Sequence, residues 1–260
     1  MFFVFGIYDA FYSGILRTLD DAGRYQPYML ALGFALILIV SYLLGSVNFA
    51  LVISKLFYHD DIRTHGSGNA GTTNVLRTYG RGAAIATFFG DGLKGVAAIL
   101  ISCAVFGGTF YCPAAAYLAA LFAILGHIFP CFAKFHGGKG FATSFLSILA
   151  LNPVIFGILC FVFFPLVLGT HYVSLGSVAT MWFYSVFLFS LGKTFNPLGD
   201  YGVPALVAIA MALLVTFSHR TNIKRLLNHT ENKTYFFGKK PAPVEKAGDG
   251  DENNDREADK

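Results

Sequence analysis

Charged residues are scarce in this sequence. Of its 260 residues, 13% are Asp, Glu, Lys or Arg, whereas 55% are hydrophobic, and the mean hydropathy is +0.59. A soluble domain carries about 25% charged residues, because its surface must face water. The shortage therefore excludes an ordinary soluble protein and indicates a chain that lies in a lipid bilayer.

Cysteine is also rare, and the spacings typical of metal ligands are missing. The four cysteines are scattered through apolar segments, and the seven histidines show neither an H-E-x-x-H pattern nor pairing with cysteine. These absences argue against a disulfide framework and against a zinc site. We therefore expect no metal, no cofactor and no nucleic-acid partner.

Long apolar runs, in contrast, are abundant. A span of the hydrocarbon core needs about 20 mostly apolar residues. One shorter run ends at Asn152-Pro153, and because proline disfavours helix in the residue before it, we expect a break there and a separate span. The sequence predicts an all-α, polytopic membrane protein with about seven transmembrane helices, at 29–57, 83–107, 113–132, 141–151, 153–170, 172–191 and 203–217.

Lysine and arginine are distributed unevenly among the connecting segments. Arg63, Arg77 and Arg81 in the first loop, Lys134 and Lys139 in the third, and a basic cluster after the last span fall on the same side. Positively charged loops tend to stay in the cytoplasm. We therefore expect the N-terminus outside and the C-terminus in the cytoplasm.

The two ends of the chain differ from the apolar part between them. Residues 1–28 form an N-terminal extension without the features of a signal peptide, and we expect either an interfacial helix or a flexible segment. Residues 239–260 are polar and charged, and we expect a disordered tail. The membrane domain is thus predicted at residues 29–238.

A glycine-rich stretch, HGSGNAGTTN at residues 65–74, contains a formal G-x-G-x-x-G. No strand precedes it, so the context of a dinucleotide-binding motif is missing. A plain connector does not need the adjoining row of hydroxyl and amide side chains, which ends in Arg77. Because glycine lets backbone N–H groups converge on an anion, the stretch favours a phosphate site.

A second stretch, GHIFPCFAKFHGGKGFAT at residues 126–143, places Lys139 among glycines at the start of a predicted helix. A helix N-terminus presents free N–H groups and a positive dipole end to an anion. The stretch is not a Walker loop, because Gly140 stands where the magnesium-binding hydroxyl is required. It therefore favours a second phosphate contact without nucleotide hydrolysis.

Further polar groups lie after the last span and inside the spans. HRTN at residues 219–222 follows the final apolar run, and a simple positively charged anchor does not account for His219 or Asn222. Asp91 and Lys94, one helical turn apart within a predicted span, can form a structural ion pair.

These motifs, together with YLLGSVNF, DGLKG and THYVSLGS, resemble in order and spacing the bacterial acyl-phosphate:glycerol-3-phosphate acyltransferase family (PlsY). The similarity runs over about residues 42–233. It implies a seven-span enzyme of the bacterial cytoplasmic (inner) membrane, with its active site facing the cytoplasm. It also implies transfer of a fatty acyl group from acyl phosphate to the 1-hydroxyl of glycerol 3-phosphate, which gives lysophosphatidic acid and phosphate. The oligomeric state stays open.

The resemblance also implies roles for individual residues. The catalytic residues would be His219, Lys139 and Asn222. The glycerol-3-phosphate site would contain Ser46, Arg63, Asn69, Asn74, Lys139 and His219. The acyl-phosphate site would contain Gly137, Gly138, Lys139, Gly140 and Ser174. One departure concerns Thr221, which stands where the family usually has glutamate.

Alternatives to this reading differ in their chemistry. Other glycerolipid acyltransferases resemble one another in an H-x-x-x-x-D motif, and no histidine of this chain has aspartate five positions on. A small transporter would explain the broken helix and the charges at membrane depth, but the polar motifs gather at one membrane face and no paired interrupted spans are seen. Within the acyltransferase reading, the general base is either His219 or a phosphate oxygen of the substrate.

Overall fold

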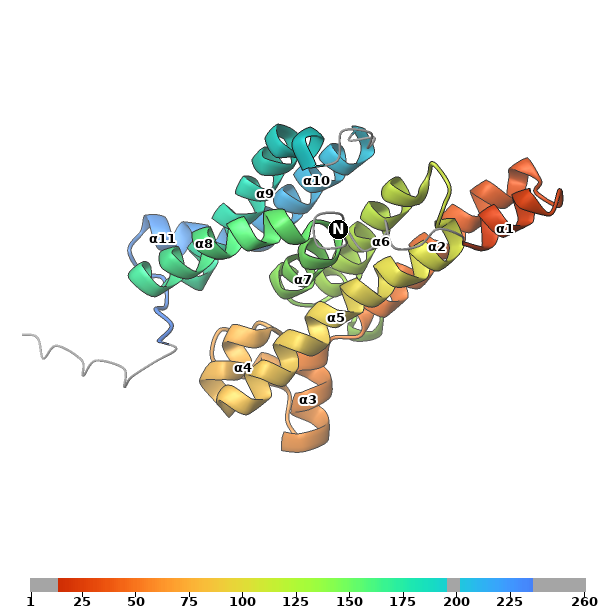
Figure 1. Ribbon diagram of the computed structural model, residues 1–260. Coiled ribbons are helices and arrows are strands. Elements are labelled where there is room, and N and C mark those ends of the chain that lie inside the picture. Colours follow the sequence, from red (N-terminus) through yellow and green to blue (C-terminus); the bar gives the residue numbers. More distant parts are fainter. Residues whose placement is uncertain (1–13, 196–201, 236–260) are drawn as a thin grey trace, which may run out of the picture.

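The computed structural model describes residues 14–195 and 202–235, which form helices and connecting turns (Figure 1). The predicted tail at 239–260 and the first part of the predicted N-terminal extension lie outside the described residues. The α-helices are α1 (Ile15–Asp21), α2 (Pro27–Ser46), α3 (Phe49–Tyr58), α4 (Thr72–Tyr79), α5 (Arg81–Phe106), α6 (Cys112–Ile128), α7 (Phe141–Leu151), α8 (Pro153–Thr170), α9 (Val173–Phe195), α10 (Gly202–Ser218) and α11 (Arg220–Leu227).

Within this part of the chain, five helical stretches are long and apolar enough to cross a membrane. They are Pro27–Tyr58, Arg81–Phe106, Cys112–Ala133, Pro153–Thr170 and Val173–Leu191. A sixth is obtained if α10 and α11, which are bent by 63°, count as one span. Helix α7 is apolar but only about 16 Å long at the usual helical rise. The all-α, multi-span class is confirmed, whereas the count of seven and the orientation stay predictions.

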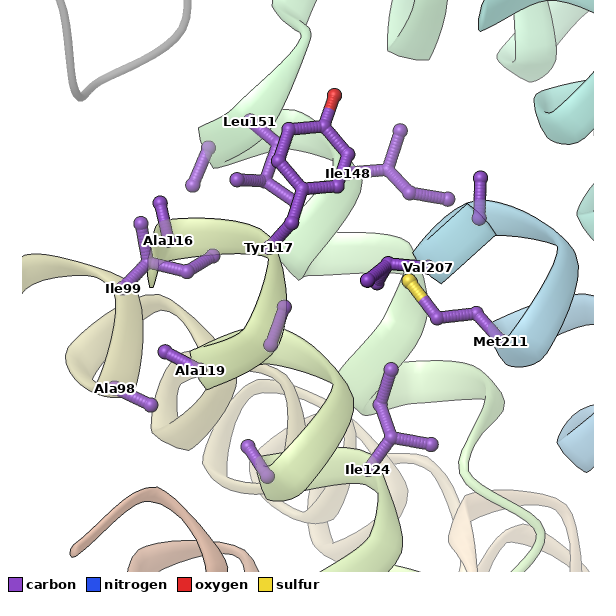
Figure 2. Packing of buried hydrophobic residues seen from close by; sticks show 14 of the residues in the cluster. Ala98, Ile99, Ala116, Tyr117, Ala119, Ile124, Ile148, Leu151, Val207 and Met211 are labelled. Carbon is purple, nitrogen blue, oxygen red and sulfur yellow. The ribbon is translucent and has the colours of Figure 1, made fainter. Parts of the chain in front are cut away.

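Small residues let the central helices approach closely. Helix α6 presents a row of buried alanines to α2 and α5, and a Cβ at Gly45 of α2 would lie 2.1 Å from the Ala123 carbonyl oxygen of α6. Such small-residue contacts replace the hydrophobic drive that helices lack in lipid. Figure 2 shows Ile99, Ile148 and Met211 of the neighbouring helices around this helix, which itself contributes Ile124. The resulting core holds α5, α6 and α7 together beside the site.

The first predicted span is interrupted between α2 and α3. At the break, Lys94 Nζ donates to the Val47 carbonyl at 2.6 Å, and the Phe49 N–H donates to Asp91 Oδ1 at 3.0 Å. The Lys94 ammonium also lies 3.1 Å from Asp91 Oδ1, so the predicted ion pair is confirmed. A buried pair of this kind satisfies backbone groups that lipid could not.

The end of the predicted N-terminal extension belongs to the fold. Helix α1 places Leu16, which is 5% exposed, in the central core, and the Gly14 N–H donates to the Gly107 carbonyl beyond the end of α5 at 2.6 Å. Residues 15–21 are therefore a packed helix.

Candidate active site

One cavity of about 660 Å³ lies where the three motif segments meet. Its walls come from the loop before α4, from α4 and α5, from the start of α7, from α8 and α9, and from the segment after α10. One part of the lining is polar and cationic, and the other part is apolar and rich in phenylalanine. The cavity is therefore amphipathic, with room for a polar head and an apolar tail.

The glycine-rich loop is held in shape by Asn74. The Asn74 amide donates to the carbonyls of Ile62 and His65 at 3.1 and 2.9 Å, and its Oδ1 accepts from the Ser67 N–H at 2.9 Å. Gly66 is left-handed, with φ +56°, and a Cβ there would lie 2.3 Å from Asn74 Oδ1. The glycine thus permits the contact that fixes the loop.

The same loop and helix α4 present polar side chains to the cavity. Ser67, Asn69, Thr73 and Arg77 all contribute to its lining. Arg77 also donates to Thr234 Oγ1 at 2.8 Å and to the Asn232 carbonyl at 3.1 Å, which joins α4 to the segment after α11. Burial lowers the Arg77 pKa, yet a guanidinium remains charged in proteins.

The glycines before α7 serve close packing. A Cβ at Gly138 would lie 2.1 Å from the His127 ring, and the N–H groups of Gly137 and Gly138 donate to the carbonyls of Ile128 and His127 at 3.3 and 3.1 Å. Gly140 is left-handed, with φ +82°, and forms the N-cap of α7. This turn positions Lys139 in the cavity wall.

A chain of hydrogen bonds connects the second and third motifs. Lys139 Nζ donates to Asn222 Oδ1 at 2.6 Å, and Asn222 Nδ2 donates to Glu231 Oε1 at 2.6 Å. Ser174 of α9 donates to the same carboxylate oxygen at 3.0 Å. Glu231 therefore orients Asn222 and Ser174 while it supplies negative charge beside Lys139.

The protonation states of Lys139 and His219 follow from burial. Burial lowers the Lys139 pKa to about 8, with Glu231 opposing and Arg225 and Arg77 adding to this shift. Burial and the Lys139 charge lower the His219 pKa to about 4. His219 Nδ1 lies 2.8 Å from the Val215 carbonyl, which can only accept, so the proton is assigned to Nδ1. At neutral pH the Nε2 lone pair is then available as a base.

Seven of the predicted site residues line the cavity: Asn69, Asn74, Lys139, Gly140, Ser174, His219 and Asn222. Ser46, Arg63, Gly137 and Gly138 do not. Ser46 donates to the Tyr42 carbonyl at 2.9 Å, and Arg63 forms an ion pair with Asp61 at 2.6 Å, so other partners engage both side chains. The placement of Ser46 and Arg63 in the glycerol-3-phosphate site stays a prediction, and the geometry does not support it.

Five charged residues of the cavity are absent from the predicted site: Arg77, Arg81, Asp91, Arg225 and Glu231. For Arg77 the sequence holds a usable signal, because it follows Thr73 by four positions and so shares one face of a helix. For Glu231 the signal is spatial only, since its partners Asn222 and Ser174 become neighbours through folding. The absence of a strand before the glycine-rich loop, where η2 (Ile62–Thr64) lies instead, also argues against the dinucleotide reading.

Comparison with known proteins places these features in a family. The family model described as glycerol-3-phosphate acyltransferase matches residues 35–229. A glycerol-3-phosphate acyltransferase of Clostridioides difficile is 44% identical over 77% of this chain and 95% of its own length. A relative in Bacillus anthracis, glycerol-3-phosphate acyltransferase 3, is 42% identical over 78% of this chain and 96% of its own length.

Solved structures agree with these relatives. The crystal structure of PlsY (YgiH), an integral membrane glycerol 3-phosphate acyltransferase, in its glycerol 3-phosphate form, matches with a TM-score of 0.69 and 34% identity. That match covers 78% of this chain and 96% of that one. The lysophosphatidic acid form matches with a TM-score of 0.66. This chain belongs to the glycerol-3-phosphate acyltransferase family.

Proposed function

We propose that this acyltransferase moves a fatty acyl group from acyl phosphate to the 1-hydroxyl of glycerol 3-phosphate, giving lysophosphatidic acid and inorganic phosphate. The observation that carries the proposal is the amphipathic cavity, in which Arg77, Lys139 and Arg225 line the same space as a run of phenylalanines. The related PlsY structures in glycerol 3-phosphate and lysophosphatidic acid forms support the acceptor and the product.

The cationic part of the cavity suits two phosphate groups. Two phosphates brought together repel each other, and cations with amide and hydroxyl donors offset that repulsion. Lys139 belongs to the glycine-rich turn before α7, and its ammonium donates to Asn222 within the cavity, so we expect it to contact both phosphates. The donor phosphate is a good leaving group, and positioning with charge stabilisation can supply most of the acceleration.

The chemical step needs one proton acceptor and no covalent enzyme intermediate. The acceptor hydroxyl oxygen forms a bond to the acyl carbon, the bond from that carbon to the phosphate oxygen breaks, and the electron pair leaves with phosphate. His219 Nε2, with its lone pair free because Nδ1 faces the Val215 carbonyl, can take the hydroxyl proton. A phosphate oxygen of the substrate is the competing acceptor.

The pH dependence tests the role of the Lys139 charge. We expect kcat/KM for glycerol 3-phosphate to hold below pH 8 and to fall about tenfold per unit above it, because Lys139 with a pKa of about 8 then loses its proton. A pH profile of the Lys139→Arg variant is the matched measurement, since its guanidinium stays charged. An unchanged alkaline limb in that variant would exclude Lys139 as its source.

A transporter is the competing function, favoured by the charges buried near the break between α2 and α3. Purified protein is assayed for phosphate release from acyl phosphate plus glycerol 3-phosphate, and in proteoliposomes for glycerol 3-phosphate flux. We expect release without flux. Flux without release would instead favour the transporter.

We further infer that residues 29–238 form the acyltransferase domain, with seven spans including the short α7, the N-terminus outside and the C-terminus in the cytoplasm of a bacterial inner membrane. The cluster of cations at the polar end of the cavity supports a cytoplasmic site. A thiol introduced by Lys224→Cys on α11 is expected to react with an impermeant reagent in inverted vesicles only. Labelling of the Lys224→Cys variant in intact spheroplasts, above the background of the unsubstituted chain, would show that the C-terminus lies outside.

A further inference from the structure

The segment that follows α11 forms part of the polar wall of the cavity. Glu231, Asn232 and Thr234 of this segment line the cavity, and all three lie beyond residue 229, where the match to the family model ends. We call residues 230–235 the strap. Thr234 is only 4% exposed although it belongs to no helix. Such burial in an irregular segment indicates that specific contacts hold the strap in place.

The strap is fixed at both ends. The Thr234 N–H donates to the His171 carbonyl, at the junction of α8 and α9, at 2.8 Å. Beside this bond the rings of Tyr235 and His171 lie 4.6 Å apart, measured between centroids. At the start of the strap, Glu231 accepts the hydrogen bonds from α9 and α11 described above. The main chain of Thr234 therefore has a defined position relative to α8 and α9.

The side chain of Thr234 binds helix α4. Arg77 Nη2 donates to Thr234 Oγ1 at 2.8 Å and to the Asn232 carbonyl at 3.1 Å. A guanidinium carries five N–H groups, three of them on Nε and Nη1. Within residues 14–195 and 202–235, no hydrogen-bond partner is found for these two nitrogens. Because Arg77 lines the cavity, their N–H groups are available to the oxygens of a phosphate.

The orientation of the Arg77 guanidinium matters for phosphate binding. Arginine binds phosphate most strongly through two parallel N–H donors, which requires a defined orientation of its planar fork. Arg77 is an exposed side chain, so packing alone does not restrain it. Ordering a long side chain only when substrate binds costs conformational entropy. The strap reduces that cost, because Thr234 and Asn232 already hold one side of the fork.

We propose that Thr234 is a positioning residue of the active site, which holds the Arg77 guanidinium with Nε and Nη1 toward a substrate phosphate. The inference rests on the proposed function and deepens it, because it requires phosphate at the polar end of the cavity. Thr234 acts through Arg77 and takes no part in the proton transfer. Loss of its hydroxyl is therefore expected to weaken phosphate binding and to change the chemical step little.

The test is Thr234→Val in the full chain, which removes the hydroxyl and nearly keeps the shape of the side chain. Inhibition of acyl transfer by inorganic phosphate measures phosphate binding, and the inhibition constant Ki is expected to rise about tenfold, the scale of a hydrogen bond to a charged group. The KM of at least one phosphate substrate is expected to rise in parallel. Incomplete folding would instead lower kcat and leave Ki and KM unchanged, because only the amount of active enzyme falls.

Thr234→Ser and Thr230→Val are the matched variants. Serine keeps the hydroxyl, so its Ki is expected to return close to that of the unsubstituted enzyme. Thr230 belongs to the same strap but is exposed and does not line the cavity, so valine there is expected to leave Ki within about twofold. An unchanged Ki in Thr234→Val, or failure of both Thr234 variants to fold, would overturn the inference and leave the proposed function intact.

A double-mutant cycle tests whether Thr234 acts through Arg77. Arg77→Lys keeps a positive charge but lacks the planar fork. In that background Thr234→Val is expected to change Ki by less than about twofold, because the group that Thr234 positions is already gone. An equal rise of Ki in both backgrounds would show that Thr234 acts independently of Arg77 and would overturn the inference. No turnover of acyl phosphate with glycerol 3-phosphate by the unsubstituted enzyme would overturn the proposed function as well.

Discussion

Replacing Lys139 with alanine is expected to lower kcat/KM for phosphate release by about 10³-fold or more. Lys139 is the cation whose ammonium binds Asn222 at 2.6 Å within the cavity, next to the turn that begins α7. The loss removes a charge that we expect to contact phosphate oxygens in a half-buried site, where a single such donor contributes about 10²- to 10³-fold. The substitution also leaves the repulsion between the two substrate phosphates less well offset by positive charge. Steady-state kinetics with both substrates varied measure the effect.

Two matched variants decide whether the effect is specific. Lys224→Ala removes an exposed lysine of α11 that does not line the cavity, and its kcat/KM is expected to stay within about twofold of the unsubstituted enzyme. Lys139→Arg keeps the charge and is expected to recover part of the activity. Equal losses of kcat/KM in Lys139→Ala and Lys224→Ala would show that only the total positive charge matters. Lys139 would then have no specific role in the site.

Replacing His219 with alanine is expected to lower kcat by about 10²- to 10⁴-fold, the contribution of a positioned general base. His219 is 4% exposed, its Nδ1 is held by the Val215 carbonyl at 2.8 Å, and its pKa of about 4 keeps it neutral in the working range. If His219 takes the proton, kcat falls far more than KM rises. If a phosphate oxygen of the substrate takes the proton and His219 only binds substrate, the loss of kcat/KM comes mainly from a higher KM.

His136→Ala is the control for this variant. His136 is exposed, and it does not line the cavity. Its kinetic constants are expected to match those of the unsubstituted enzyme. His219→Ala with kinetic constants within about threefold of the unsubstituted enzyme would contradict any role for His219 in the reaction.

The fold class could be predicted from the sequence, because bilayer insertion depends on local composition. The break at Asn152-Pro153 is confirmed, since α7 ends at Leu151 and α8 begins at Pro153. The break between α2 and α3 was not predicted, because residues 47–49 contain neither proline nor glycine. It is held by Asp91 and Lys94, which belong to another helix.

The candidate site could be predicted in outline but not residue by residue. The motif strings showed which segments carry phosphate-binding chemistry, and those segments do line one cavity. Local turns decide which residue of a motif faces that cavity. Arg63 turns back to Asp61, whereas Arg77 lies on the face of α4 that lines the cavity. The contact of Phe145 with Phe163 could not be predicted either, because the two rings meet only through the packing of α7 on α8.

The most direct test of the account is a turnover assay of the purified enzyme with glycerol 3-phosphate and three donors side by side: acyl phosphate, acyl-CoA and acyl carrier protein charged with the same chain. The account predicts that acyl phosphate alone gives lysophosphatidic acid, with one phosphate released per product and no nucleotide or metal added. Comparable or greater turnover with acyl-CoA or charged acyl carrier protein would contradict the claim that the polar end of the cavity binds two phosphates.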